Sequence, residues 1–457
     1  MSRKAMETTD SEAPAPRRAA LPNTSDNGCW DQLPELRGLP YSGYLMNRGR
    51  RRPLFLRVET VNRCNNRCVI CAYQHQTRPT TTMPMDVFEK TIRDYAELGG
   101  GYLSLTPLVG DFFLDRDLIK RLHLLESIPE ITSLGVTTNA TMAHRFNDKE
   151  LAYVIGRFDR LSISIYGVDR EEYEKMTQRT TYPQMINGIR RVVLASRNPV
   201  MLQFRLLKDR LQDAGQEFGS SAAGSVSRAS GPNEVEASVA RGRRTPTVHS
   251  ILSMFGRALA FINRTALPPG GRMAMAHLLS SSRQYRRLAA LAQGFARRQS
   301  HKYLYNWLAN EVFPDLTLAE IFARTSINSV IHTYANWGIY SESDVHLPFD
   351  ASWETNSHAG HKEQCMIPMT ACMVFSNGNV SFCPCDNYDD AVELRLGNIT
   401  EATLSEIYNS AVSGRLWNWG KYGTPRFCQH CSFHKSMAII AENPSILADP
   451  HKLVGAG

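Results

Sequence analysis

The stretch LFLRVETVNRCNNRCVIC, residues 54–71, joins a short apolar run to three closely spaced cysteines. Further apolar runs follow at 102–109, 131–138, 160–167, 200–207 and 328–338. Between them lie stretches with helical periodicity at 86–98, 115–127, 148–155, 182–196 and 316–325, with Asp86 and Asp148 expected as N-caps. This alternation predicts parallel β/α units with functional residues at the carboxyl ends of the strands. Six units are too few for a closed eight-stranded barrel, so we expect an α/β fold, a partial (β/α)6 TIM-like barrel.

Length and composition exclude several classes of protein. The chain has 457 residues, is 42% hydrophobic and contains 10 cysteines, so it is neither a disulfide-stapled mini-protein nor disordered throughout. No run approaches the ~18 apolar residues of a membrane span, and the first residues lack the apolar core of a secretory signal. We therefore expect a reducing, cytoplasmic location, where clustered cysteines indicate metal or redox chemistry.

The net charge of +8 lies in one segment of the chain. Residues 211–300 contain 12 arginines, no lysine and four acids, an excess equal to that of the whole sequence. We expect an insertion at 211–314 between the fifth and sixth strands, with 211–248 disordered and 250–312 helical. A solvated helical lid is favoured over a surface that binds nucleic acid or an anionic membrane.

The rest of the chain divides around the barrel. We expect a mostly flexible arm at 1–50, the barrel at 51–345, a small C-terminal α+β domain at 346–440 that contains a helix near 403–413, and a tail at 441–457.

Cys64, Cys68 and Cys71 have the spacing CxxxCxxC. Three thiolates on one loop can bind three corners of a [4Fe–4S] cluster and leave the fourth iron without a protein ligand. A structural zinc site would need four protein ligands. The spacing therefore favours a cluster with one open iron.

CxxxCxxC after the first strand of a partial β/α barrel resembles the radical S-adenosylmethionine (radical SAM) superfamily. In that family the open iron binds SAM, which is cleaved to methionine and a 5′-deoxyadenosyl radical that removes hydrogen from the substrate. The resemblance implies a [4Fe–4S] cluster and SAM as cofactors. It also implies an electron donor such as flavodoxin or ferredoxin.

The resemblance implies SAM contacts near the ends of the first three strands. Gly110 and Asp111 align with the family's Gly-Gly-Glu motif, which receives the SAM amino group. Asn139 aligns with the TNG motif, in which Ala140 here replaces the glycine, and Ile70 occupies a position that is commonly aromatic. From the residues alone, Gly110 as part of a turn and Asp111 as a helix cap remain open alternatives.

Further SAM contacts are implied around the fourth strand. Ser162 and Ser164 match positions whose hydroxyls meet the SAM ribose, and Arg179 matches a position that pairs with the SAM carboxylate. The alternatives are a serine that satisfies backbone groups and an arginine that is simply solvated.

A second group of cysteines follows the pattern C-x12-G-x4-C with a distant CxxC. Its members are Cys365, Cys383, Cys428 and Cys431, and FSNGNVSF between the first two predicts a β-hairpin that turns at Asn377-Gly378. The pattern resembles the Twitch domain, the short form of the SPASM extension of radical SAM enzymes, and so implies an auxiliary [4Fe–4S] cluster. A four-thiolate zinc site is the alternative, Cys385 is an alternative ligand to Cys383, and Cys372 is expected on the buried side of the hairpin.

Polar residues of the barrel that have no assigned role are candidates for substrate contact. Arg205 is the first choice, with a structural pairing to Glu59 or Asp111 as the alternative. The other candidates are Glu59, Gln203, His332, Tyr334 and Asn336.

The implied reaction is SAM-dependent oxidation of a hydroxyl on a sugar, cyclitol or similar small molecule, with the auxiliary cluster as electron acceptor. Radical modification of a ribosomally made peptide is the alternative enzyme function. A zinc-containing protein that binds nucleic acid or a membrane surface is the alternative from another class, and nucleic acid is an unlikely partner.

Overall fold

The computed structural model describes residues 45–47, 50–206, 301–331, 333–334, 352–353, 364–384, 387–429, 431 and 433–437. The greater part of the expected arm, residues 207–300 of the chain, which include most of the expected insertion, and the tail lie outside these residues. Within the described chain, no helix is long and apolar enough to cross a membrane.

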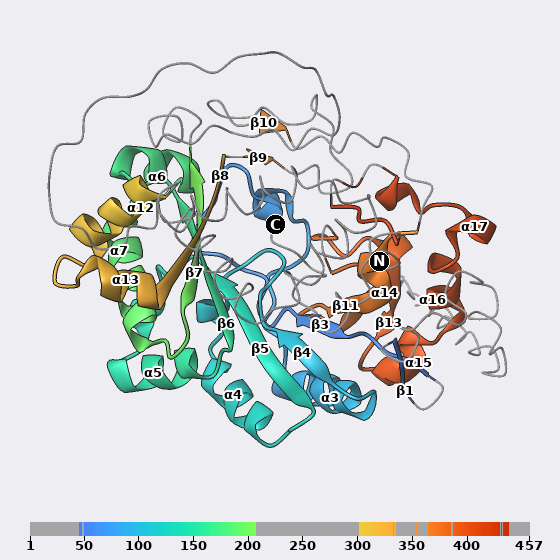
Figure 1. The fold of residues 1–457 in the computed structure, drawn as a ribbon. Coiled ribbons are helices and arrows are strands. Elements are labelled where there is room, and N and C mark those ends of the chain that lie inside the picture. Colours follow the sequence, from blue (N-terminus) through green and yellow to red (C-terminus); the bar gives the residue numbers. More distant parts are fainter. Residues whose placement is uncertain are drawn as a thin grey trace, which may run out of the picture.

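Six parallel strands form the barrel, in the order in which they occur in the chain. They are β3 (Phe55–Val58), β4 (Gly101–Ser104), β5 (Ile131–Thr138), β6 (Arg160–Tyr166), β7 (Val200–Leu206) and β8 (Thr325–Ile331). Each coincides with a predicted apolar run, although β8 begins three residues before the predicted one. The strands form an open partial barrel (Figure 1), so the predicted fold class is confirmed.

Helices cover the outer side of these strands (Figure 1). They are α3 (Met85–Glu97), α4 (Leu118–Glu126), α5 (Asp148–Gly156), α6 (Arg170–Thr177), α7 (Tyr182–Ala195), α12 (Lys302–Trp307), which continues into the π-helix η5 (Leu308–Val312), and α13 (Leu318–Arg324). All but α6 match predicted helical stretches. Because the apolar side chains of each strand alternate, those of β6 that face the helices (Leu161, Ile163 and Ile165) are buried in the core.

The two predicted N-caps are wrong. Helix α3 has Pro84 at its N-cap, and Asp86 lies inside the first turn. Helix α5 is capped by Asn147, whose side chain accepts from the backbone of Glu150 while the Glu150 carboxylate accepts from the backbone of Asn147. A carboxylate in the first turn still stabilises a helix through the helix dipole, so Asp86 and Asp148 favour the same helices without capping them.

The C-terminal elements extend the barrel sheet. Strand β11 (Ala371–Val374) pairs in parallel with β3, and β12 (Asn379–Ser381) and β13 (Arg395–Asn398) follow as antiparallel strands. The predicted hairpin is therefore confirmed as β11–β12, with Gly378 at a φ of 86° in its turn.

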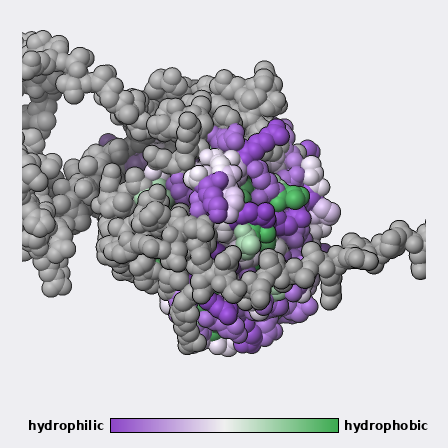
Figure 2. Space-filling view, turned by 90° about the vertical axis from the view of Figure 1, so that its right-hand side faces the viewer, coloured by the Kyte–Doolittle hydropathy of each residue, from purple (hydrophilic) through white to green (hydrophobic). Residues whose placement is uncertain are grey.

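Short helices complete this part of the molecule, beside β3 in Figure 1. They are α14 (Met366–Thr370), α15 (Leu404–Tyr408), α16 (Ala411–Leu416) and α17 (Trp419–Tyr422). The helix predicted at 403–413 is two helices, because Ser410 caps α16 and interrupts the run. The outward face of this region is mostly hydrophilic, with isolated hydrophobic spots (Figure 2).

Aromatic side chains fill the base of the barrel. The rings of Phe55 and Tyr102, neighbours on β3 and β4, have centroids 4.9 Å apart. The Tyr102 hydroxyl occupies the space over Gly135, where an added Cβ would lie 1.8 Å from it. Glycine on β5 is therefore required for this packing, and the polar part of the barrel lies nearer the carboxyl ends of the strands.

Candidate active site

The cysteine loop follows β3 and is fixed by backbone hydrogen bonds to the end of α6. The amides of Arg67 and Val69 donate to the carbonyls of Thr177 and Met176, each at 2.9 Å. Arg179, just beyond α6, donates through Nε to the Asn65 carbonyl at 2.8 Å. The structure therefore brings Arg179 to the cysteine loop, and its pairing with the SAM carboxylate stays a prediction.

The three thiols of this loop influence one another electrostatically. Burial raises the pKa of Cys64, Cys68 and Cys71. The neighbouring thiols raise the pKa of Cys68 further, while the Arg205 guanidinium lowers the pKa of Cys68 and Cys71. Buried thiols of this kind are good metal ligands once a metal displaces their protons, so these residues fit the cluster that their spacing implies.

Within the described ranges, no three His, Cys, Asp or Glu side chains lie close enough together to hold one metal ion. A cubane cluster takes one thiolate at each iron, so its ligands are spread more widely than those of one ion.

Gly110 and Asp111 lie between the cysteine loop and the ends of β4 and β5. Gly110 has a φ of 154°, and a Cβ there would lie 3.0 Å from the carbonyl oxygens of Val61 and Arg63. The amide of Asp111 donates to the Arg63 carbonyl at 3.0 Å. Glycine thus allows this segment to pass directly against the chain that leads into the cysteines.

The Asp111 carboxylate is buried and hydrogen bonded by the chain itself. It accepts from the amides of Phe113 (3.1 Å) and Asn139 (2.8 Å) and from the Thr138 hydroxyl (2.8 Å). It also caps the 3-10 helix η3 (Phe112–Leu114), which is the structural role that the sequence left open. Burial raises its pKa to about 6, and the three hydrogen bonds oppose that rise. Its role toward the SAM amino group stays a prediction.

Asn139 connects β5 to the cysteine loop. Its Nδ2 donates to Asn65 Oδ1 at 3.0 Å and lies 3.7 Å from Cys64 Sγ. Ala140, which replaces the glycine of the family motif, keeps a glycine-like φ of 60°. The backbone here therefore retains the conformation that the motif's glycine would supply.

The inner face of the barrel is polar along β6, β7 and β8. Ser164, Gln203 and Asn328 are paired in register across the three strands, and Tyr166 pairs with Arg205 one step closer to the carboxyl ends. These five residues are half-buried. Along β6 and β7 they alternate with fully buried core residues. Ser162 lies one step nearer the base, beside Met201.

Arg205 is placed near the thiols of Cys68 and Cys71, and neither expected structural partner holds it. Glu59 is paired with Arg78 at 2.7 Å, and both Asp111 oxygens accept from the donors described above. The alternative that paired Arg205 with Glu59 is therefore wrong. Among the candidate substrate residues, Glu59 is taken up by this ion pair, and His332, Asn336 and the side chain of Tyr334 lie outside the described residues. Ile70 is buried, and its role toward SAM stays a prediction.

The auxiliary cysteines are all buried free thiols. Cys365 begins α14, and its Sγ accepts from the Lys435 amide at 3.5 Å. Burial, with a smaller contribution from the Cys383 thiol, raises its pKa to about 12. Cys428 ends the 3-10 helix η7 (Arg426–Cys428), and its carbonyl accepts from the Cys431 amide at 3.4 Å.

Two further expectations concern neighbouring cysteines. Cys372 on β11 is fully buried, as predicted. Cys385 lies outside the described residues.

Sequence reasoning missed several residues at this site. Burial and the three thiols raise the pKa of the Tyr166 hydroxyl, and Arg205 lowers it; its place at the end of a polar strand face was a usable signal. Arg57 on β3 donates to the Pro384 carbonyl at 2.7 Å, directly after the auxiliary Cys383. Nothing local in the sequence predicts that contact, because it depends on the parallel pairing of β3 with β11.

Two family models match the chain. Residues 58–202 match the radical SAM superfamily, and residues 365–432 match SPASM, an iron–sulfur cluster-binding domain. GTP 3′,8-cyclase of Petrotoga mobilis is 25% identical over 159 residues, 34% of this chain and 47% of that protein. Molybdenum cofactor biosynthesis protein 1 of Drosophila melanogaster is 27% identical over 144 residues, 30% of this chain and 24% of that protein. The chain thus spans less than half the length of these relatives.

Solved structures of similar architecture span most of the chain. Streptococcus suis SuiB bound to S-adenosylmethionine is 13% identical, covers 86% of this chain and 75% of that one, and has a TM-score of 0.41. BtrN in complex with AdoMet and 2-DOIA is 13% identical, covers 83% and 92%, and has a TM-score of 0.38.

Proposed function

We propose that this chain, a radical SAM enzyme with a C-terminal SPASM-type iron–sulfur domain, oxidises a hydroxyl group of a sugar, cyclitol or similar small molecule. The observation that supports this most is the polar inner face formed by Ser164, Gln203 and Asn328, with Tyr166 and Arg205 beside the cluster-binding thiols. Hydroxyl, amide and guanidinium groups together suit a substrate that is rich in hydroxyls.

The cofactor residues are assigned from the motifs and their positions. Cys64, Cys68 and Cys71 would bind the first cluster. SAM would contact the chain through Ile70, Gly110, Asp111, Asn139, Ser162, Ser164 and Arg179. When bound, this cluster and SAM supply a 5′-deoxyadenosyl radical that removes a hydrogen atom from the substrate.

The role of Arg205 follows from its charge and position. It is half-buried on the inner face, and within the described chain no ion pair with a carboxylate occupies it. A guanidinium donates several hydrogen bonds in a fixed plane. We assign it to orient the substrate oxygens, so that the carbon to be oxidised faces the cysteine loop.

Oxidation of an alcohol to a ketone removes two hydrogens overall. After one leaves the carbon as an atom, the hydroxyl proton and one electron must also leave. Cys365, Cys383, Cys428 and Cys431 would hold the auxiliary cluster that accepts this electron. We also infer that a flavodoxin or ferredoxin donates the electron for SAM cleavage, in a reducing cytoplasm that keeps the described cysteines as free thiols.

Anaerobic incubation with SAM and dithionite tests the proposal. We expect 5′-deoxyadenosine to form, about eight irons per chain, and deuterium to move into 5′-deoxyadenosine from a C–D bond of the true substrate. Candidate sugars and cyclitols labelled at each carbinol carbon identify that bond. Transfer from a peptide, and from none of the alcohols, would overturn the hydroxyl assignment.

Three cysteine variants separate the two metal sites. Cys64→Ala should abolish 5′-deoxyadenosine formation, because the first cluster loses a ligand. Cys428→Ala should allow SAM cleavage without substrate oxidation. Cys372→Ala, which removes a buried thiol of β11 that belongs to neither site, should leave the iron content unchanged. Normal SAM cleavage by the Cys64 variant would mean that the first site is wrongly assigned.

A further inference from the structure

Two loops that each follow a proposed cluster ligand lie against one another, although they come from distant parts of the sequence. The first, residues 72–82, leaves Cys71 through the 3-10 helix η2 (Ala72–His75). The second, residues 387–390, follows Cys383. Tyr388 of the second loop is 1% exposed and packs against Ala72 and Val109. The aromatic ring thus lies beside the residue that follows a ligand of the first cluster.

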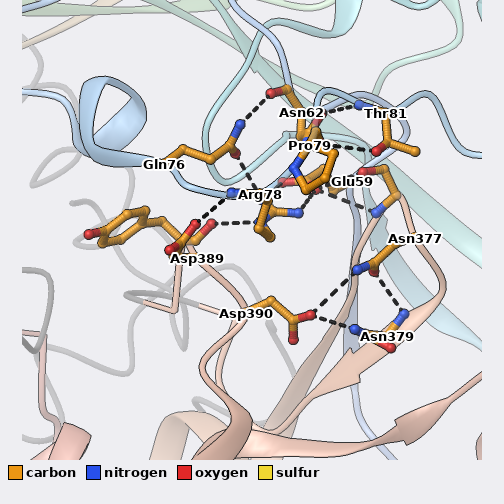
Figure 3. A network of polar contacts seen from close by, with 12 residues as sticks. Glu59, Asn62, Gln76, Arg78, Pro79, Thr81, Asn377, Asn379, Asp389 and Asp390 are labelled. Atoms are coloured by element: carbon orange, nitrogen blue, oxygen red, sulfur yellow. Dashed lines mark hydrogen bonds and ion pairs between the residues drawn. The ribbon is translucent and has the colours of Figure 1, made fainter.

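Arg78 holds the two loops together at the end of β3 (Figure 3). Its Nη1 and Nη2 donate to both carboxylate oxygens of Glu59, at 2.7 and 3.0 Å. Its Nε donates to the Tyr388 carbonyl at 3.1 Å. The guanidinium also stacks over the Phe375 ring of the hairpin, 4.5 Å from the centroid. The Arg78 side chain, which belongs to the first loop, therefore connects that loop to the end of β3 and to the second loop.

Glu59 is held from both sides of this junction. It is fully buried, and its Oε1 also accepts from the Ser376 hydroxyl at 3.1 Å, in the turn between β11 and β12. A bidentate guanidinium–carboxylate pair fixes both distance and orientation. The carboxylate thus holds the hairpin turn to the end of β3.

Asp389 makes the reciprocal contact from the second loop. Its carboxylate accepts from the Thr77 amide at 2.8 Å, the Thr77 hydroxyl at 2.5 Å and the Arg78 amide at 3.1 Å. The next residue, Asp390, turns away and accepts from Asn379 (Figure 3). It also accepts from Arg395 inside the C-terminal elements. Adjacent carboxylates therefore serve different parts of the structure.

We propose that Glu59, Arg78 and Asp389 form a clasp. The clasp fixes the second loop, which follows the auxiliary Cys383, relative to the first loop, which follows Cys71. Its three members are positioning residues: they act on the distance between the two metal sites and do not touch the substrate. The inference rests on the proposed function in that an electron must pass from the substrate to the auxiliary site, a transfer that depends on a fixed separation.

Hydrogen exchange of the full-length protein tests the clasp without any assay of turnover. Asp389→Ala removes the acceptor of the Thr77 and Arg78 amides, and we expect those amides to exchange at least tenfold faster. The matched control is Asp390→Asn, which should leave exchange in residues 72–82 unchanged and alter it near Asn379. Unchanged protection of residues 72–82 in Asp389→Ala would overturn the clasp.

A second measurement tests the positioning role. In the reconstituted and reduced enzyme, we expect the magnetic interaction between the two clusters to broaden their EPR signals, and we expect Asp389→Ala to change this broadening while Asp390→Asn does not. A spectrum of Asp389→Ala identical to wild type would overturn the positioning role. Failure to find any alcohol substrate would instead overturn the proposed function and leave both of these readouts intact.

Discussion

Single backbone positions set the geometry around the cysteine loop, and Ala140 shows this most directly. It adopts a φ of 60° at the end of β5, in the left-handed region that costs a residue with a Cβ roughly 1–2 kcal/mol. This strained conformation of Ala140 lets the chain turn directly after Asn139. Gly110 solves a similar problem without strain, because it has no Cβ.

Ala140→Gly should stabilise the protein. Removing the Cβ relieves the left-handed strain, and the extra freedom of glycine in the unfolded chain offsets only part of the gain, so we expect about 0.5–1 kcal/mol. Urea denaturation measures the difference. Ala143→Gly, at a buried position three residues on with no positive φ, is the control and should destabilise. Equal effects of the two variants would contradict the strain argument.

Asp111 predicts a pH dependence of stability. Its folded pKa is about 6 because of burial, whereas an unfolded Asp titrates near ~3.9. As pH rises from about 4 to 6, the unfolded chain ionises first, so the stability contributed by this group falls across that window and stays low above it. Relative to Asp111→Asn, the metal-free protein should lose roughly 2 kcal/mol of unfolding free energy between pH 4 and 7. Urea denaturation measures the unfolding free energy of both proteins at each pH. An unfolding free energy that changes equally with pH in the two proteins would refute this.

Among the elements, helix α7 approaches the turn after β5 very closely. Gly188 on α7 lies so near that a Cβ would be 2.1 Å from the Ala140 carbonyl oxygen. The backbone of α7 at Gly188 is thus packed directly against the backbone of the turn at Ala140. Any residue larger than glycine must push the helix away.

Gly188→Ala should destabilise the fold by about 3 kcal/mol or more, because an overpacked contact with backbone cannot be relieved by a rotamer change. Thermal unfolding is the measurement. The control is Gly156→Ala at the end of α5, where the nearest atom would be 3.5 Å away and the helix propensity of alanine favours the variant by up to about 1 kcal/mol. A Gly188 variant as stable as the Gly156 variant would show that the contact is not tight.

At the scale of the whole molecule, the Arg78–Glu59 pair links the barrel to the C-terminal elements in a buried position. Arg78→Met leaves the Glu59 carboxylate buried without its partner and should cost about 3–5 kcal/mol. Glu59→Met combined with Arg78→Met should cost clearly less than the sum of the single changes. Urea denaturation of the four proteins measures the coupling. Asp315→Asn, which breaks the exposed pair with Arg190, is the control and should cost under ~1 kcal/mol. Strict additivity would mean that the pair carries no coupling.

The sequence predicted the six barrel strands because each carries apolar residues that pack against the helices, as Leu161, Ile163 and Ile165 do on β6. It missed α6, whose sequence REEYEKMT is short and charged, and it misplaced the start of β8 because TSIN reads as polar. The caps failed because aspartates within a first turn resemble N-caps in sequence.

The proposed ligand cysteines were predictable because their spacing is local. The partner of Glu59 was not, because Arg78 lies in an irregular loop with no periodicity. The contacts that Arg57 and Asp389 make also depend on the pairing of β3 with β11. These two strands are about 300 residues apart in the chain. Contacts of that kind follow from the assembled sheet and not from any window of the chain.

The parallel pairing of β11 with β3 has one more consequence. Phe55–Val58 forms backbone hydrogen bonds with β11 on one side and with β4 on the other. The C-terminal elements are therefore part of the barrel sheet and not a separate domain joined by a linker. A chain cut at a protease site introduced between Ile331 and Gln364 should therefore give two fragments that co-elute under native conditions. Such a nicked enzyme would allow either half to be isotopically labelled separately and then reassembled.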